Sequence, residues 1–158
     1  MVQGGDGRVL LHIANKLQDA SPRKMVGIEL SSDRAQVARN NVKEAIKANL
    51  FPSKIINIEI KCANALEVDY SDATVAFLYL MRRGLRLIKP LLYRQGNCTR
   101  VVTYMTGFQD VTPKVVVKCK VRHHQGAAWP VYLFDCSKTT PQEVESSEPL
   151  CGANKMRI

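Results

Sequence analysis

Three glycines close to the start of the sequence, Gly4, Gly5 and Gly7, lead directly into a segment with helical apolar spacing. Glycine lets the backbone adopt positive φ and lets a ligand approach the main chain closely. Glu29 follows 22 residues after Gly7, at the end of an apolar segment that indicates a buried strand. An acidic side chain there can accept hydrogen bonds from ribose hydroxyl groups. The combination predicts a nucleotide site, with an ordinary glycine turn beside an exposed Glu as the alternative.

Two common nucleotide-binding patterns are absent from the sequence. Gly5 to Leu10 has the first two glycines of G-x-G-x-x-G but leucine in the third place, so the NAD-type fingerprint fails. No Walker A loop of the form G-x-x-x-x-G-K-[ST] occurs either. The glycines therefore do not indicate a dinucleotide dehydrogenase or a P-loop protein.

Several motifs together resemble the class I S-adenosylmethionine-dependent methyltransferases. In that family the first motif reads roughly D/E-x-G-x-G-x-G, and an acidic residue follows the next strand. The resemblance covers about residues 3–136 and, within the family, is greatest for the small single-domain protein-lysine methyltransferases. The matching segments are G-D-G-R at Gly5–Arg8, V-G-I-E-L at Val26–Leu30, N-A-L-E at Asn64–Glu67 and F-L-Y-L at Phe77–Leu80.

The resemblance implies S-adenosylmethionine as the cofactor. Asn64 occupies the place of an Asp that accepts a hydrogen bond from the adenine amino group, and its amide oxygen can also accept, without charge. Glu29 would accept hydrogen bonds from the ribose. The implied cofactor contacts are Gly5, Asp6, Gly7, Glu29, Leu30, Asn64 and Ala65.

Two tyrosines, Tyr79 and Tyr104, each stand at the carboxyl end of a predicted strand. Methyl transfer from a sulfonium is an in-line displacement, so the protein chiefly positions the nucleophile. As candidate catalytic residues, the two rings would form an aromatic wall that orients an amine. Each could instead be a core aromatic with its hydroxyl at the surface. No Asn/Asp-Pro-Pro-Tyr/Phe motif follows the first of these strands, which argues against the members of the family that modify bases or glutamine.

Helix and strand patterns alternate along most of the sequence, which predicts an α/β fold with a mostly parallel sheet. After residue 113 two strand patterns follow each other without a helix, as in a C-terminal antiparallel hairpin. The resemblance makes this a Rossmann-like methyltransferase sheet, because that family adds an antiparallel strand pair. We expect helices at 8–17, 31–46 and 85–92, and strands at 25–30, 56–60, 75–80, 100–105, 115–121 and 130–134.

The beginning of the sequence departs from the family pattern. Gln3 occupies the place of the first motif glycine, and residues 1–7 are assigned to the cofactor loop, which leaves no strand before it. The chain is therefore expected to be N-terminally truncated, with the first strand missing from the sheet. Stabilisation by a partner strand and a degenerate relative of the family are the alternatives. Strands 25–30 and 75–80 would flank a gap with unpaired main-chain groups. The chain alone is then predicted to be aggregation-prone or partly molten, unless the N-terminal residues or the tail fill the gap.

The net charge and the cysteines indicate which partners and which cellular location to expect. The sequence carries 23 Lys and Arg against 14 Asp and Glu, and the net charge of +9 favours polyanions or acidic partners. Arg39, Lys43 and Lys47 share the outer face of the second predicted helix as a candidate basic patch. The five cysteines include no C-x-x-C pair, and no signal peptide is recognisable. An intracellular location, cytoplasmic or mitochondrial, is expected.

No metal site or membrane span is expected. His123 and His124 follow Cys119 closely, but a second pair of ligands is lacking, which favours a polar hairpin turn. No apolar run approaches the roughly 18 residues that a membrane span needs. Residues 1–136 are expected to form one methyltransferase-like domain, and the Ser-, Pro- and Glu-rich residues 137–158 a flexible tail.

The sequence is therefore interpreted as an S-adenosylmethionine-dependent methyltransferase that modifies a lysine of a protein substrate. Two alternatives stay open. One is a non-catalytic, truncated binding module, for which Gln3 and the missing strand are the evidence. The other is an RNA-binding or RNA-modifying protein, for which the net charge of +9 is the evidence.

Overall fold

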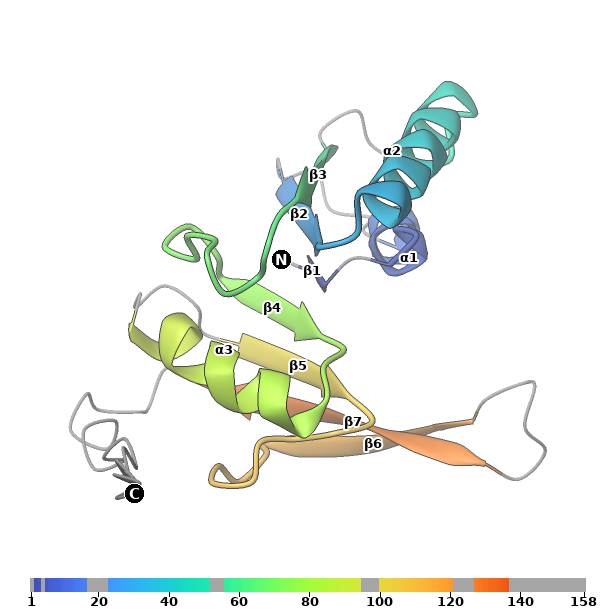
Figure 1. Ribbon diagram of the computed structural model, residues 1–158. Coiled ribbons are helices and arrows are strands. Elements are labelled where there is room, and N and C mark those ends of the chain that lie inside the picture. The colour runs from blue at the N-terminus through green and yellow to red at the C-terminus, as the bar shows by residue number, and fades with distance from the viewer. Residues whose placement is uncertain are drawn as a thin grey trace, which may run out of the picture.

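The computed structural model describes residues 2–3, 5–16, 23–51, 56–94, 100–120 and 127–136. These residues form a seven-stranded sheet with the strand order β3-β2-β1-β4-β5-β7-β6 and three helices (Figure 1). The elements are β1 (Val2–Gln3), α1 (Arg8–Lys16), β2 (Arg23–Glu29), α2 (Ser32–Lys47), β3 (Ile56–Cys62), β4 (Val75–Leu78), α3 (Arg82–Arg94), β5 (Arg100–Tyr104), β6 (Val115–Lys120) and β7 (Ala128–Asp135).

The strand directions confirm the predicted fold class. Strands β1 to β5 pair in parallel, and β7 lies antiparallel between β5 and β6. From β1 the chain builds outward through β2 to β3, then returns to β4 and builds outward on the other side. The order therefore reverses between β1 and β4, and ligands of open α/β sheets bind at the carboxyl ends of the strands at such a point.

The expectation that the first strand is missing is wrong. Val2 and Gln3 form β1, in which Val2 pairs with Gly27 of β2 and Phe77 of β4, and Gln3 pairs with Ile28 of β2. Val2 and Gln3 are thus not part of a bare cofactor loop. The main-chain groups of β2 and β4 require partners, and the extended residues before the glycine turn supply some of them. The strand has two residues against seven in β2, so it bridges the two halves of the sheet over a short length.

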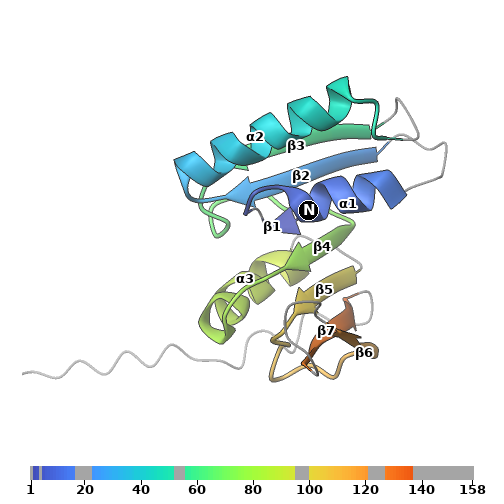
Figure 2. The same ribbon diagram turned by 90° about the vertical axis from the view of Figure 1, so that its right-hand side faces the viewer.

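The helices cover opposite faces of the sheet (Figure 2). Leu10 and Ala14 of α1 are fully buried in one cluster with Met25 of β2 and Ile60 of β3. The next residue, Val26, belongs to a second cluster with Leu85 of α3. Because successive strand residues point to opposite faces, α1 and α2 lie on one face and α3 on the other.

A close approach of α1 to the sheet depends on Gly27. A Cβ at this position would stand 2.6 Å from Cδ1 of Leu10 and 2.8 Å from Cδ1 of Ile60. Real Cβ atoms do not tolerate such distances, so a larger residue would force the buried side chains of Leu10 and Ile60 to shift. Glycine at this position therefore lets Leu10 of α1, the helix that follows the glycine turn, pack directly on β2.

Most element boundaries agree with the sequence patterns, with two differences near the carboxyl edge. Helix α3 begins at Arg82 rather than Leu85, because the amide of Leu85 already donates to the carbonyl of Met81. Strand β4 ends at Leu78, so Tyr79 lies one residue beyond the strand.

At the other end of the sheet, β6 forms an edge whose residues are all exposed. The predicted apolar face of this strand is therefore not buried, and Val117 is 52% exposed. Within the described ranges, no helix is long and apolar enough to cross a membrane. The tail at 137–158 and the turn with His123 and His124 lie outside those ranges.

Candidate active site

The glycine turn connects β1 to α1 in a conformation that requires glycine. Gly5 has a φ of +62° and Gly7 a φ of +80°. A Cβ on Gly7 would lie 3.3 Å from Cβ of Ala38, so α2 closes the space beside it, whereas nothing lies within 4 Å of the Cβ position on Gly5. The carbonyl of Gly7 accepts the amide of Leu11, which starts α1. Gly4 lies outside the described ranges.

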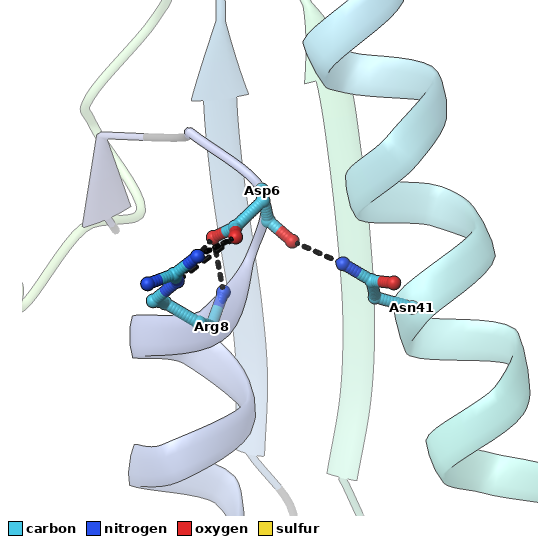
Figure 3. A network of polar contacts seen from close by, with 3 residues as sticks. All are labelled: Asp6, Arg8 and Asn41. Atoms are coloured by element: carbon cyan, nitrogen blue, oxygen red, sulfur yellow. Dashed lines mark hydrogen bonds and ion pairs between the residues drawn. The ribbon is translucent and has the colours of Figure 1, made fainter.

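Asp6 stabilises this turn through hydrogen bonds with Arg8 and Asn41 (Figure 3). Its carboxylate accepts Nε of Arg8 at 2.8 Å and the Arg8 amide at 3.2 Å. Its main-chain carbonyl accepts Nδ2 of Asn41 on α2 at 2.9 Å. Hydrogen bonding from the Arg8 side chain lowers the pKa of the Asp6 carboxyl from its usual value. The predicted cofactor residue Asp6 therefore directs its carboxylate toward Arg8, and Asn41 is a contributor that sequence reasoning missed.

Glu29 lies at the end of β2 and joins two backbone turns. Its Oε2 accepts the amide of Gly5 at 2.7 Å, and its Oε1 accepts the amide of Ser31 at 3.0 Å. Ser31 in turn caps α2 by accepting the amide of Arg34. Each carboxylate oxygen has further lone pairs for an external donor. The side chain can therefore hold the glycine turn and accept ribose hydroxyls at the same time.

Asn64 follows β3 and is held in a turn of its own. Its Oδ1 accepts the amide of Leu66 at 3.0 Å, and its Nδ2 donates to Oε1 of Glu67 at 2.9 Å. The preceding residue, Ala63, donates its amide to the carbonyl of Glu29 at 3.0 Å. The structure thus brings the predicted residues Glu29 and Asn64 to the same edge of the sheet. Glu67 adds a carboxylate beside Asn64 that sequence reasoning had not singled out.

Ala65, the next predicted contact, is fixed by a buried tyrosine. The hydroxyl of Tyr70 donates to the carbonyl of Ala65 at 2.7 Å. Tyr70 is almost fully buried, and desolvation raises the pKa of its hydroxyl to about 12. The hydroxyl therefore stays protonated and can donate to Ala65 throughout the physiological pH range.

Two exposed leucines lie next to these polar groups. Leu30 follows Glu29 and is 72% exposed, and Leu66 follows Ala65 and is 39% exposed. Apolar side chains left open at the carboxyl edge can cover the flat faces of an adenine ring. Leu66 was not among the predicted contacts, although an apolar residue directly after a strand and a polar turn is a signal that could have found it.

The residues present fit S-adenosylmethionine. Nothing lies within 4 Å of the Cβ position on Gly5, so the turn leaves its backbone open to a ligand there. Glu29 supplies acceptors for the ribose, and Leu30 with Leu66 supplies apolar surface for the base. The cofactor, when bound, supplies a methyl group activated by a positively charged sulfur.

The two candidate catalytic tyrosines lie together. The ring centroids of Tyr79 and Tyr104 are 5.4 Å apart with an interplanar angle of 55°. Tyr79 is 58% exposed, so it is not a core aromatic, and Tyr104 is half-buried. The two rings lie together at the carboxyl ends of β4 and β5. The structure thus brings the two predicted residues into contact, and their part in catalysis stays a prediction.

The predicted basic patch on α2 is not a set of free charges. Nε of Arg39 donates to the carbonyl of Ile60 at 3.3 Å, and Nζ of Lys47 pairs with Glu44 at 2.8 Å. Of the three, only Lys43 is exposed and forms no ion pair in the described part of the chain. Arg39 therefore attaches α2 to β3, which the helical periodicity could not reveal. Within the same ranges, no cluster of metal-ligating residues occurs.

Comparisons with known proteins agree with this geometry. No protein-family model matches the chain. A protein-lysine N-methyltransferase from Saccharolobus islandicus is 31% identical over 116 residues, which are 72% of this chain and 65% of that protein. The chain thus spans just under two thirds of the length of this curated relative.

Among solved structures, an RNA methyltransferase from Salinibacter ruber in complex with S-adenosyl-L-homocysteine has a TM-score of 0.68 and 28% identity. The match covers 89% of this chain and 81% of that one. A putative tRNA (m1A22) methyltransferase from Streptococcus pneumoniae in complex with S-adenosyl-L-methionine has a TM-score of 0.51 and 11% identity. That match covers 84% of this chain and 74% of the other, and it bears on the fold alone.

The strand order, the glycine turn with Glu29 and these likenesses agree with the class that the motifs implied. The chain has the fold of the class I S-adenosylmethionine-dependent methyltransferases, and it is similar to methyltransferases in both sequence and structure. S-adenosylmethionine is the cofactor that the site fits. The chain is similar in sequence to the protein-lysine N-methyltransferase from Saccharolobus islandicus.

Proposed function

We propose that the chain transfers the methyl group of S-adenosylmethionine to the side-chain amine of a lysine in a protein. The observation that carries the proposal is the contact between the exposed Tyr79 and the half-buried Tyr104, whose ring centroids are 5.4 Å apart at the ends of two adjacent strands. The name of the relative from Saccharolobus islandicus supports a lysine acceptor. The five cysteines include no C-x-x-C motif, and this supports action in a reducing, intracellular compartment.

In the proposed methyl transfer, the protein chiefly has to position the lysine amine against the methyl group of the cofactor. The lone pair of a neutral lysine amine attacks the methyl carbon, the bond from that carbon to sulfur breaks, and the electron pair stays on sulfur. The product amine carries the positive charge and releases a proton to solvent. Aromatic faces attract cationic nitrogen and the adjacent polarised methylene. Tyr79 and Tyr104 would therefore orient the lysine before the transfer and hold the charged amine after it.

The placement of the two sites supports the same proposal. The glycine turn follows β1 and the tyrosines follow β4 and β5, so both lie at the carboxyl edge next to the reversal in strand order. Cofactor and acceptor would thus meet where the two halves of the sheet join. In-line displacement needs the nucleophile and the methyl group on one line, and rigid strand ends supply that geometry.

RNA methyl transfer is a second candidate. It is favoured by the similarity to the RNA methyltransferase from Salinibacter ruber and by the net charge of +9. Aromatic side chains also stack on unpaired bases, so the tyrosine pair is compatible with this substrate. A non-catalytic binding module is the third candidate. It differs from lysine and RNA methyl transfer because it requires no transfer of the methyl group.

A labelling experiment separates these functions. Purified chain is incubated with S-adenosylmethionine carrying a tritiated methyl group and with a cell extract that contains protein and RNA. The proposal expects label that protease removes and ribonuclease does not, with methyllysine recovered after acid hydrolysis. Label removed by ribonuclease would assign the chain to RNA. Cofactor binding without any transferred label would favour the binding module.

A further inference from the structure

Three arginines in the first turns of α3 have no carboxylate partner among the residues that the structure describes. Arg82, Arg83 and Arg86 are all exposed, and among the described residues none of them forms an ion pair. Other cations behave differently, since Arg8 pairs with Asp6 and Lys89 of the same helix pairs with Asp110.

The position of these charges is unfavourable for the helix itself. The first turn of α3 contains no acidic residue, whereas the first turn of α2 contains Asp33. The amino end of a helix carries a partial positive charge, so cations there are repelled and anions are attracted. The three guanidinium groups and the helix end therefore add up to one locally positive surface that an external anion would stabilise.

This surface adjoins the acceptor side of the candidate active site. The chain runs from the tip of β4 through Tyr79 and Met81 directly into α3 (Figure 1). Tyr79 is 58% exposed and Met81 is 80% exposed. The first of the arginines thus follows Tyr79 by three residues, at the end of α3 that begins next to the acceptor side.

We propose that Arg82, Arg83 and Arg86 form a docking surface for acidic residues that flank the target lysine of a protein substrate. The inference rests on the proposed lysine methyl transfer. Arginine suits this role because its planar guanidinium binds a carboxylate through two parallel hydrogen bonds. The exposed side chains of Tyr79 and Met81 offer apolar contacts for the rest of the peptide.

The extent of the surface favours a peptide over an RNA strand. The three arginines occupy positions i, i+1 and i+4, so they lie within about one helical turn. Lys89 in the next turn is already paired with Asp110. A groove for single-stranded nucleic acid follows the backbone over several phosphates. Two or three carboxylates match the confined patch better than such a run of phosphates.

Peptide binding tests the docking surface without requiring catalysis. Two fluorescent peptides contain the same central lysine, flanked either by Asp and Glu or by Asn and Gln, and their binding to the full chain is followed by anisotropy in the presence of S-adenosylhomocysteine. We expect the acidic peptide to bind about tenfold more tightly. The triple variant Arg82→Gln, Arg83→Gln and Arg86→Gln should reduce this preference to about twofold or less.

A matched control removes the same charge elsewhere. Lys16, Lys43 and Lys118 are exposed lysines on α1, α2 and β6 that have no ion pair in the described part of the chain. Replacing all three by Gln should leave the preference for the acidic peptide close to tenfold. Equal losses in both triple variants would overturn the proposal, because the attraction would then be diffuse. Gln at the amino end of α3 also relieves repulsion, so unchanged circular dichroism is expected.

Two further outcomes separate this surface from the proposed function. If the acidic peptide binds through the arginines but receives no methyl group, the docking surface stands and lysine methyl transfer fails. If a single-stranded RNA oligonucleotide binds more tightly than the acidic peptide, and the arginine variant but not the lysine variant releases it, the docking proposal is overturned in favour of RNA.

Discussion

The two halves of the sheet differ in how their polar groups are satisfied. On the cofactor side, formed by β1 to β3 with α1 and α2, the glycine turn is tied by Asp6, Glu29 and Asn41 through contacts within the chain. On the acceptor side, formed by β4, β5 and α3, Tyr79 and the arginines of α3 face outward. The difference suggests that one half is prepared for a single, fixed ligand and the other is open to a macromolecule.

The largest expected effect concerns β1, where the two halves meet. The β1 ladder on β2 includes only Gly27 and Ile28, so residues 23–26 have no partner on that side within the described ranges. Each unpaired buried main-chain group costs about 1–3 kcal/mol, and lengthening β1 to roughly five or six residues should add several kcal/mol to the free energy of unfolding. Urea denaturation of the 158-residue chain and the extended chain measures this.

Because β1 is short, we still predict that the chain alone is aggregation-prone or partly molten. We expect a broad, aggregation-prone transition for the chain as it stands and a cooperative one for the extended chain. A sharp two-state melt of the monomeric chain, with no gain on extension, would show that two paired residues are enough to join the halves.

The next largest effect concerns Glu29, because its carboxylate holds the glycine turn and would also bind the ribose of the cofactor. S-adenosylmethionine at a hundredfold excess over Kd should stabilise the chain by about 2.7 kcal/mol. Glu29→Ala should abolish this stabilisation, since it removes the ribose acceptor and frees the amides of Gly5 and Ser31. Glu29→Gln keeps one acceptor oxygen and should retain part of it. Thermal shift titrations compare the three chains, and equal shifts would contradict the assigned role.

The glycine turn offers a matched pair of substitutions. Gly7→Ala should lower the free energy of unfolding by about 2–3 kcal/mol, because it combines positive φ with a contact to α2, whereas Gly5→Ala should cost about 1–2 kcal/mol for φ alone. Chemical denaturation measures both. Equal costs would show that α2 does not limit the space beside the turn.

Tyr70 gives a smaller effect that depends on pH. The folded pKa is raised to about 12 from 10.0 in the unfolded chain, so the neutral hydroxyl is favoured in the folded state. Its contribution is fully present below pH 10 and is lost as the pH rises toward 12. Tyr70→Phe should cost about 1–2 kcal/mol at neutral pH through the lost hydrogen bond to Ala65. It should also flatten the decline in stability between these pH values, as followed by urea denaturation at each pH.

The sequence predicted the cofactor side better than the acceptor side. The glycine turn is a local feature, because its positive φ angles depend on Gly5 and Gly7 themselves, and Glu29 could be found from its spacing after that turn. The strand patterns also predicted the hairpin of β6 and β7. The motif for β1 was not recognised, since two extended residues have no periodicity and their role depends on pairing with β2 and β4.

Contacts between distant segments explain the remaining differences. The helical spacing of α2 placed Arg39 on an outer face, but its side chain reaches the carbonyl of Ile60 in β3. Asn41 likewise contacts Asp6 from a position 35 residues away. The open arginines of α3 could not be distinguished by sequence from paired ones such as Arg8. Only the tertiary structure separates charges that brace the fold from charges that face solvent.

Calorimetric titration of the chain with S-adenosylmethionine tests the central claim most directly. The internally braced glycine turn and Glu29 predict binding at one site per chain, with S-adenosylhomocysteine competing for the same site. Replacing Arg82, Arg83 and Arg86 by Gln should leave the measured Kd for the cofactor within about twofold, because these side chains belong to the acceptor side. A folded chain that takes up no cofactor at millimolar concentration would contradict the account.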